Sequence, residues 1–536
     1  MHRLLQFVQM PQTHNDPCSE AVIRSGERSV KCTKSQARWI LAATILASSM
    51  AFIDGTVVNV AIPFLQRSLN TTAAGVQWVV EAYSLFLAAL LLVGGSLGDR
   101  YGRRRIFLIG VFIFAVSSIA CGFSVNIGQL ILARAVQGVG GALLIPGSLA
   151  IISASFDESE RGTAIGTWSG FSAITTAIGP VLGGWLVEHF SWRAVFFLNV
   201  PLATAVILIS LAHVPESRTS TQRLDWRGAS LATVGLGLLV FGLIESSNSK
   251  FGSLVIIFTI TGGLISLALF VLNEARAKNA MMPLHLFRSS DFSGANLLTL
   301  FLYTALSGTF FFFTLNLIQV LGYSATAAGA ALLPFIIIMF ALSRWSGGLI
   351  KRFGSKLPLV IGPLIAASGF FLFTNPFGGG SYWSGYFPAV VVLGLGMAVT
   401  IAPLTTTVMN SVDQQQAGVA SGINNAVSRT AGLLAIAIFG VIMLQSFSHA
   451  LALTLTDSQV DPSVKAAVYD QRTRLAGIEL PEKLVEQDMI QLKQSISKAF
   501  EYGFRIVMFV AASLAVSSSL AAWFLIGSHK TSAAKH

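Results

Sequence analysis

The chain has 536 residues, of which 53% are hydrophobic and only 11% are charged, and its mean hydropathy is +0.70. Soluble proteins carry about 25% charged residues, so this composition excludes a soluble globular fold. The net charge of +11 could suggest nucleic acid. The basic residues, however, are spread over short connectors between apolar runs, which fits membrane topology better and predicts no nucleic-acid partner.

The first apolar run begins at about residue 39 and is followed by many others. It is too long for the apolar region of a signal peptide, so we expect a retained first helix and no cleaved leader. The three cysteines, Cys18, Cys32 and Cys121, show neither a paired framework nor a metal-ligand spacing. We expect free thiols, no metal and no cofactor.

About fourteen apolar segments approach the ~20 residues that a helix needs to cross hydrocarbon. Backbone groups in lipid must be satisfied within the segment, so each is expected to be a helix. The sequence therefore predicts an all-α polytopic membrane protein. The expected helices begin near Trp39, Gln77, Ile106, Gly128, Gly162, Ala194, Trp226, Ser253, Asn296, Ala325, Leu357, Tyr382, Gly418 and Gly503.

Alternate connectors are rich in Lys and Arg, which predicts that they face the cytoplasm. These basic residues are Arg100, Arg103, Arg104, Arg105, Arg218, Arg223, Arg227, Arg276, Lys278, Arg288, Lys351, Arg352 and Lys356. An even number of helices places both tails, 1–38 and 529–536, in the cytoplasm of a cell with an inner (plasma) membrane. The charged segment 446–502 then lies outside, where we expect a solvated loop with short helices.

Two halves of the chain repeat each other in parallel. NTTAAG at 70–75 resembles SATAAG at 324–329, GSLGDRYGRR at 95–104 is echoed by GGLIKRFGSK at 347–356, and 145–166 is echoed by 402–422. The sequence predicts six-helix bundles at 39–213 and 291–528, with two extra helices in the linker 214–290.

The connector GSLGDRYGRRR resembles the signature loop of the major facilitator superfamily. Glycines allow a tight turn there, and an acid among arginines can form a charge cluster. The resemblance implies that this loop motif latches the two halves and acts in gating; the alternative is a basic loop that only sets topology. Its residues are Gly95, Asp99, Arg100, Gly102, Arg103 and Arg104. The second copy has Lys351 in place of Asp99, so any latch there works differently.

Asp54 in the first expected helix and Arg134 in the fourth are charges inside hydrocarbon, which cost several kcal/mol unless paired or hydrated. At ~1.5 Å per residue they lie about 13 Å and 10 Å below the outer ends of their helices. Since the depths agree, the two side chains could meet in one cavity. We expect Asp54 to titrate during transport while Arg134 favours its ionised form. A static buried ion pair is the alternative.

Glu81, about one turn into the second helix, either is solvated at the interface or faces the same cavity and joins the proton coupling. For substrate binding the sequence offers polar and aromatic side chains within helices: Asn59, Gln137, Phe310, Asn316, Asn424 and Asn425. Consecutive helix positions point in different directions, so at most about two of Phe310 to Phe313 can face a cavity, and lipid contact is expected for the rest. Arg429 stands beside Asn424 and Asn425, a group for which helix packing is favoured over substrate binding.

The run AIGPVLGG resembles the antiporter motif of exporters in the superfamily, which importers generally lack. Its Gly179, Pro180, Gly183 and Gly184 favour close helix packing with a local bend. SWRAVFFLNVP at 191–201 and DGTVVNVAIP at 54–63 resemble further signatures of the fourteen-helix drug:proton antiporters, although Ala194 stands where those proteins usually have Trp.

No GxxxxGK[ST] phosphate loop, HExxH or CxxC is present, which argues against ATP as direct energy source and against a metal or redox enzyme. The resemblance implies a non-enzymatic, proton-coupled exporter of hydrophobic or cationic organic compounds, monomeric and working by alternating access. Export of a metabolite, siderophore or amino acid, or import by proton symport, stays an alternative on the same scaffold. A receptor or enzyme without transport is the alternative from another class. Whether a periplasmic adaptor protein extends the path is open.

Overall fold

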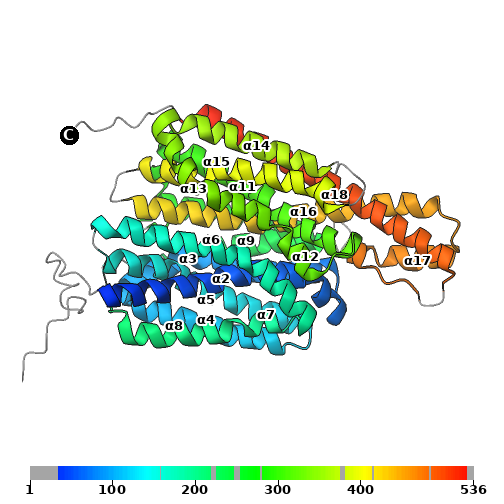
Figure 1. Ribbon diagram of the computed structural model, residues 1–536, viewed down its shortest axis with the longest axis horizontal. Helices are drawn as coiled ribbons and strands as arrows, with labels where there is room; N and C mark the ends of the chain where they lie inside the picture. Colours follow the sequence, from blue (N-terminus) through cyan, green and yellow to red (C-terminus); the bar gives the residue numbers. More distant parts are fainter. Residues whose placement is uncertain are drawn as a thin grey trace, which may run out of the picture.

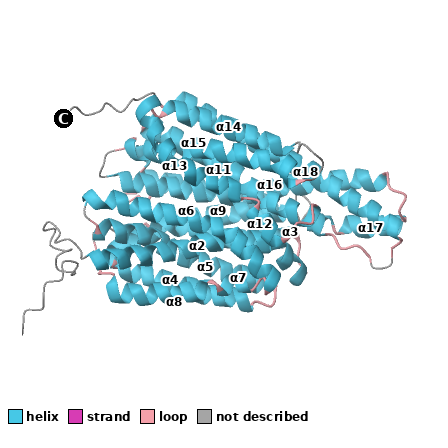
Figure 2. Ribbon diagram, viewed as in Figure 1, coloured by secondary structure: helices cyan, strands magenta, loops and turns pink. Residues whose placement is uncertain are grey.

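The computed structural model describes residues 34–156, 158–218, 225–246, 254–277, 280–374, 381–412, 416–481 and 484–527. Within these ranges the regular secondary structure is helical and includes no strand, as Figure 2 shows. Fourteen helical spans in the described part of the chain are long and apolar enough to cross a membrane. The predicted all-α polytopic fold is therefore confirmed. The predicted tails fall mostly outside the described residues.

The first bundle occupies the lower half of Figure 1 and consists of six spans. Its helices pack closely through glycine: a Cβ atom on Gly94 would lie 2.0 Å from the carbonyl oxygen of Ala142. Small residues of this kind let membrane helices approach each other. The helices are α2 Lys34–Ser68, α3 Ala73–Tyr101, α4 Arg103–Phe123, α5 Ile127–Ser155, α6 Glu158–His189, and α7 Ala194–Phe197 with α8 Asn199–His213.

Two helices, α9 Trp226–Ser246 and α10 Leu254–Arg276, lie between the bundles in sequence. They form a hairpin in which Gly263 packs against the backbone of Leu239. Helix α9 contacts α3 of the first bundle and α16 of the second, whereas only 17% of the α10 span is buried. The hairpin thus lies against the seam between the bundles, with α10 on its outer side.

The second bundle occupies the upper half of Figure 1. Its elements are η1 Leu284–Arg288, α11 Ser290–Leu315 with the π-helical turn η2 Asn316–Val320, α12 Ala325–Ala330, α13 Leu333–Phe353, α14 Lys356–Thr374, η3 Tyr382–Tyr386, α15 Phe387–Asn410, α16 Ala417–Thr456 and α18 Glu486–Leu525. Helices α16 and α18 extend beyond the other helices to a hairpin with α17 Pro462–Asp470 and η5 Arg472–Gly477, at the right of Figure 1. We call this the hairpin end, and the opposite end, which has the loop between α3 and α4, the motif end.

The internal repeat is visible in local geometry. Thr72 caps the N-terminus of α3, and Ser324 caps α12 in the same way. Gly102, between α3 and α4, has φ of 114°, and Gly354, between α13 and α14, has φ of 75°. Side chains strain such backbone, so glycine is favoured at this turn in both copies.

The helix ends differ from the expected ones near the hairpin. Instead of a loop from about Ser446 to Tyr502, α16 continues to Thr456 and α18 begins at Glu486. Hydropathy marks only the stretch that lipid can cover, and a helix that continues into water takes polar residues there. The chain outside these two helices is therefore only 457–485.

Candidate functional site

A cavity of about 930 Å³ lies between the two bundles. Its walls come from α2, α3, α5 and α6 of the first bundle and from α11, α13, α15 and α16 of the second. More than half of the described lining side chains are apolar or aromatic, with polar ones among them, as in sites for drug-sized organic molecules. Apart from two tyrosines, the polar lining residues are Thr56, Asn59, Ser84, Arg134, Thr176, Ser307, Ser346, Asn425, Ser428 and Arg429.

The cavity reaches toward the motif end, where its lining includes Gly166 near the start of α6 and Ser346 near the end of α13. At the hairpin end the bundles are in contact. Glu188 of α6 accepts hydrogen bonds from the backbone N–H of Thr326 at 2.8 Å and from its hydroxyl at 2.6 Å. Gln319 of η2 donates to Gln66 of α2 at 3.0 Å. These contacts close the cavity on that side.

The glycine motif of α6 lies in this closed region. A Cβ on Gly183 would meet Val57 of α2 at 2.1 Å, and one on Gly184 would meet the backbone of Ala325 at 2.5 Å. The carbonyl oxygen of Pro180 lies 2.2 Å from where a Cβ on Gly329 would be. The motif therefore packs against its own bundle on one side and, through α12, against the other bundle.

Asp54 of α2 and Arg134 of α5 form an ion pair of 2.5 Å, and both side chains are almost completely buried, at 0% and 1% exposure. The guanidinium also donates through Nε to the carbonyl oxygen of Val79 at 3.1 Å. It lies 4.3 Å from the ring centre of Tyr83, a cation–π contact. The structure thus brings together the two charges whose depths in the sequence agree.

The second carboxylate oxygen of Asp54 is bound by two amides. Gln137 of α5 donates to it at 2.9 Å and Asn199 of α8 at 3.0 Å. Both amides also donate to the hydroxyl of Ser118 in α4, at 3.3 Å and 2.9 Å. The network around Asp54 therefore joins four helices of one bundle, α2, α4, α5 and α8, while Arg134 lies between Asp54 and the cavity.

Glu81 of α3 is fully buried, and neither of its carboxyl oxygens has a hydrogen-bond partner in the described part of the chain. Its helix face carries Ala74 and Leu85, which pack with Leu433 and Ala437 of α16. Glu81 therefore lies at the seam between the bundles, and it is not among the residues that line the cavity.

The residues predicted for substrate binding divide into two groups. Asn59, Phe310 and Asn425 line the cavity. Gln137 belongs to the Asp54 network, and Asn316 donates to the hydroxyl of Tyr386 at 2.9 Å in the second bundle. Asn424 donates to Thr299 and Asn296 of α11 at 2.8 Å and 3.1 Å, so it joins two helices.

The four consecutive phenylalanines of α11 also fall into two groups, two in the cavity wall and two in the core of the second bundle. Phe310 and Phe311 line the cavity. Phe312 and Phe313 have 0% exposure within the second bundle, so the expectation that they contact lipid is wrong. The side of α11 that carries Phe312 and Phe313 is enclosed by its own bundle, which hydropathy alone does not reveal.

The loop motif makes contacts within the first bundle. Asp99 pairs with Arg103 at 2.8 Å. Glu216, which follows α8, accepts hydrogen bonds from the backbone N–H groups of Arg104 at 3.0 Å and Arg105 at 3.1 Å, and thereby caps α4. A Cβ on Gly102 would collide with the same carboxylate. Gly95 packs on Pro146 of α5, and Arg100 stacks on Tyr101. A latch to the second bundle remains a prediction.

Sequence reasoning missed the side chains of Ser118, Asn199, Tyr83 and Glu216 in these networks. Asn199 and Tyr83 contact Asp54 and Arg134, and Glu216 caps the loop motif. Asn199 offered a signal, since an amide within an apolar run needs a partner in lipid. Glu216 offered none, because a carboxylate near a helix end is usually solvated.

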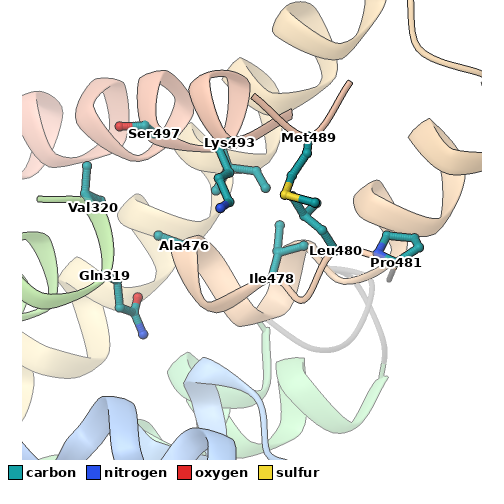
Figure 3. Close-up of a pocket in the computed structure, with 10 residues that line it drawn as sticks. Gln319, Val320, Ala476, Ile478, Leu480, Pro481, Met489, Lys493 and Ser497 are labelled. Carbon is teal, nitrogen blue, oxygen red and sulfur yellow. The ribbon is translucent and has the colours of Figure 1, made fainter. Parts of the chain in front are cut away.

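A second cavity of about 430 Å³ lies at the hairpin end, lined by η2, η5 and the start of α18. Figure 3 shows Met489 and Lys493 of α18 beside Ile478 and Leu480 of the hairpin, with Gln319 on the other side. Arg474 of the hairpin also accepts, through its carbonyl oxygen, a hydrogen bond from Gln66 at 3.1 Å. The hairpin of the second bundle therefore rests on the first.

Comparison with known proteins gives a consistent result. The family model described as Major Facilitator Superfamily matches residues 44–436. The multidrug resistance protein Stp of Mycobacterium tuberculosis (strain CDC 1551 / Oshkosh) is 33% identical over 90% of this chain and 91% of its own length. The tetracenomycin C resistance and export protein of Streptomyces glaucescens is 32% identical over 90% of each chain.

Solved structures share the fold at low identity. A bacterial homologue of the human lysosomal transporter Spinster, in an inward-facing and unoccupied conformation, has a TM-score of 0.64 and 16% identity, over 91% of this chain and 98% of that one. A D-xylose-proton symporter has a TM-score of 0.58 and 13% identity, over 92% and 98%.

Proposed function

The chain belongs to the Major Facilitator Superfamily, and on that premise we propose that it exports hydrophobic organic compounds in exchange for protons. Its relatives include proteins named for resistance to and export of antibiotics. An apolar cavity of about 930 Å³ between the bundles supports a drug-sized cargo. The chain is thus a multi-pass membrane transporter rather than an enzyme.

The observation that carries the proton-coupling proposal is the position of Asp54 behind Arg134. Arg134 is part of the cavity wall, and the counter-charge that holds it there is a buried carboxylate. Protonation of Asp54 removes this counter-charge and leaves the guanidinium with neutral partners only, so its hold weakens and it can turn toward the cavity or its contents. A proton on Asp54 and a substrate in the cavity would then compete through Arg134.

We propose Glu81 as a second proton site. A buried carboxylate without hydrogen-bond partners is costly, so Glu81 is better accommodated at the seam with a proton. When the bundles separate along α3 and α16, water reaches the carboxyl group and the proton can leave. This would couple Glu81 to the bundle movement rather than directly to the cargo.

Alternating access requires that the contacts at the hairpin end open while the motif end closes. The glycine motif and the Glu188–Thr326 hydrogen bonds are the contacts that must part. The basic connectors support placing the motif end, and with it both tails, in the cytoplasm of the inner (plasma) membrane. In this orientation the cavity faces the cytoplasm, from which an exporter collects its cargo.

The direction of transport rests on relatives and on the glycine motif. The D-xylose-proton symporter has the same fold at 13% identity, so the fold is compatible with import as well. The cephamycin export protein CmcT of Amycolatopsis lactamdurans, 33% identical over 77% of this chain and 85% of its own length, favours export, although a metabolite cargo stays an alternative.

The test uses proteoliposomes with an imposed pH gradient and the uncharged fluorescent compound N-phenyl-1-naphthylamine. The wild type should move the compound against its gradient when protons flow the other way. Asp54→Asn should lower this gradient-driven flux at least about 10-fold while leaving binding measurable, since the variant loses the proton site that competes with the cargo through Arg134. Asp461→Asn, at the cap of α17 outside the bundles, is the matched control. Full activity of Asp54→Asn would refute the coupling role.

A further inference from the structure

The charge of the cavity wall is unbalanced. Two charged side chains are among the described residues that line the cavity, Arg134 and Arg429, and no described Asp, Glu, Lys or His is. Arg134 is neutralised from behind by Asp54, whose two oxygens are taken by Arg134, Gln137 and Asn199. Among the described residues, the wall therefore presents one positive charge without a counter-charge, at Arg429.

Arg429 extends from α16 of the second bundle toward the first. Its guanidinium carbon lies 5.5 Å from the ring centre of Phe52 in α2. Within the described residues, Arg429 makes this cation–π contact but no side-chain hydrogen bond and no ion pair. A guanidinium at membrane depth is tolerated when water or an anion solvates it. A transport cavity supplies the first, and a cargo can supply the second.

The surroundings of Arg429 define a shape as well as a charge. Phe52 lies against the guanidinium, and Tyr303 of α11 interacts electrostatically with it and contributes an aromatic face on the second bundle's wall, while Phe310 lines the same cavity two turns farther along α11. A planar guanidinium offers a fork of N–H donors that matches carboxylate, sulfonate or phosphate oxygens, and aromatic faces suit a flat apolar body. A cation would find no described carboxylate on this wall and would be repelled by Arg429.

We propose that the cavity selects organic anions, molecules with a flat apolar body and an acidic group that pairs with Arg429. The inference rests on the proposed export function and names its substrate class. It departs from the hydrophobic or cationic compounds that the sequence favours. It also fits the energetics, because an anion leaving the cell moves in the direction that an inside-negative potential drives it.

The test compares two dyes that share the xanthene ring system and differ in charge: 6-carboxyfluorescein, an anion, and rhodamine 6G, a cation. Binding to the full-length protein in lipid nanodiscs is followed by fluorescence anisotropy at neutral pH. The wild type should bind carboxyfluorescein more tightly than rhodamine. Arg429→Gln should weaken carboxyfluorescein binding about 10- to 100-fold, the range for loss of a charged hydrogen bond, and leave rhodamine binding equal or stronger.

Two further variants serve as controls for this interpretation. Arg429→Lys keeps the charge without the fork and should retain part of the affinity for the anion. Arg505→Gln, an exposed arginine of α18 outside the cavity lining, should bind both dyes as the wild type does. If Arg429→Gln fails to fold, the order of the two dyes on the wild type and on Arg429→Lys still decides.

The proposal is overturned if the wild type prefers rhodamine, if carboxyfluorescein does not bind, or if Arg429→Gln binds it unchanged. Failure of the export function has a different signature. In that case the anion binds with the expected dependence on Arg429, but a pH gradient drives no flux in proteoliposomes.

Discussion

The two bundles present different chemistry to the same cavity. In the first, Arg134 is fixed by Asp54, Val79 and the ring of Tyr83, and its exposure is 1%. In the second, Arg429 is partly exposed and is in contact with the face of Phe52. One arginine is thus part of a closed network, and the other faces the interior of the cavity.

This difference fits the proposed division of work between the two halves of a duplicated scaffold. The repeat preserves the features that shape helices, such as the capping hydroxyls of Thr72 and Ser324 and the turns at Gly102 and Gly354. The buried and cavity-lining charges Asp54, Arg134 and Arg429 are not repeated. In the proposed mechanism, the charge that controls a proton needs a partner that holds it at rest, whereas the charge that recognises a cargo must be left without one.

The largest expected difference between the two arginines is in the free energy of unfolding. Arg134→Gln leaves the buried carboxylate of Asp54 without its cation, and breaking a buried pair in this way typically costs about 3–5 kcal/mol. Arg429→Gln removes no hydrogen bond or ion pair and should cost less than about 1 kcal/mol. The free energy of unfolding, from denaturant titration in mixed micelles, measures both. Equal losses would mean that Arg429 is as much a structural residue as Arg134.

A smaller effect is expected where the bundles touch at the hairpin end. Gly184→Ala places a Cβ 2.5 Å from the backbone of Ala325 in the other bundle. Overpacking costs about 1–3 kcal/mol, here only in the state closed at the hairpin end, so the state open at that end should gain about fivefold or more. Gly347→Ala, a glycine with no atom within 4 Å of its Cβ position, is the control.

The reporter is a cysteine in place of Asn59, which lines the cavity, in a chain without Cys18 and Cys32. Cys121 is buried and stays. A membrane-impermeant maleimide added at the hairpin side should label the Gly184→Ala variant faster than the Gly347→Ala variant. Identical labelling rates would show that the glycine contact does not hold the closed state.

The sequence predicts well those features that the cost of burial in lipid determines. It yields the number of spans, and it singles out Asp54 and Arg134, because each is a charge that hydrocarbon does not tolerate alone. Helix ends escape it, as at α16 and α18, since a helix can continue into water without a change in its hydrogen bonding.

The sequence also does not predict how each helix is rotated about its axis, because packing against neighbouring helices sets this rotation. Asn424 and Asn425 are adjacent and equally polar, yet Asn424 joins α16 to α11 and Asn425 lines the cavity. Likewise, nothing in the amino-acid sequence indicates that Phe310 lines the cavity and Phe312 does not. Which side chain meets the cavity is decided by the whole bundle.

Phe310 and Phe312 give the smallest expected difference, that between a residue of the cavity wall and one of the protein core. Phe310 lines the cavity and packs edge-on against Phe335 at 5.0 Å, whereas Phe312 is fully enclosed. Phe310→Leu should weaken binding of N-phenyl-1-naphthylamine about threefold to tenfold, in line with ~0.5–1.5 kcal/mol for an aromatic contact. Phe312→Leu should leave binding unchanged and lower the free energy of unfolding instead, because the leucine fills its site incompletely. Fluorescence titration and denaturant titration on both variants separate the two effects. An equal loss of binding in both would mean that the aromatic wall acts through the packing of α11 and not through contact with the cargo.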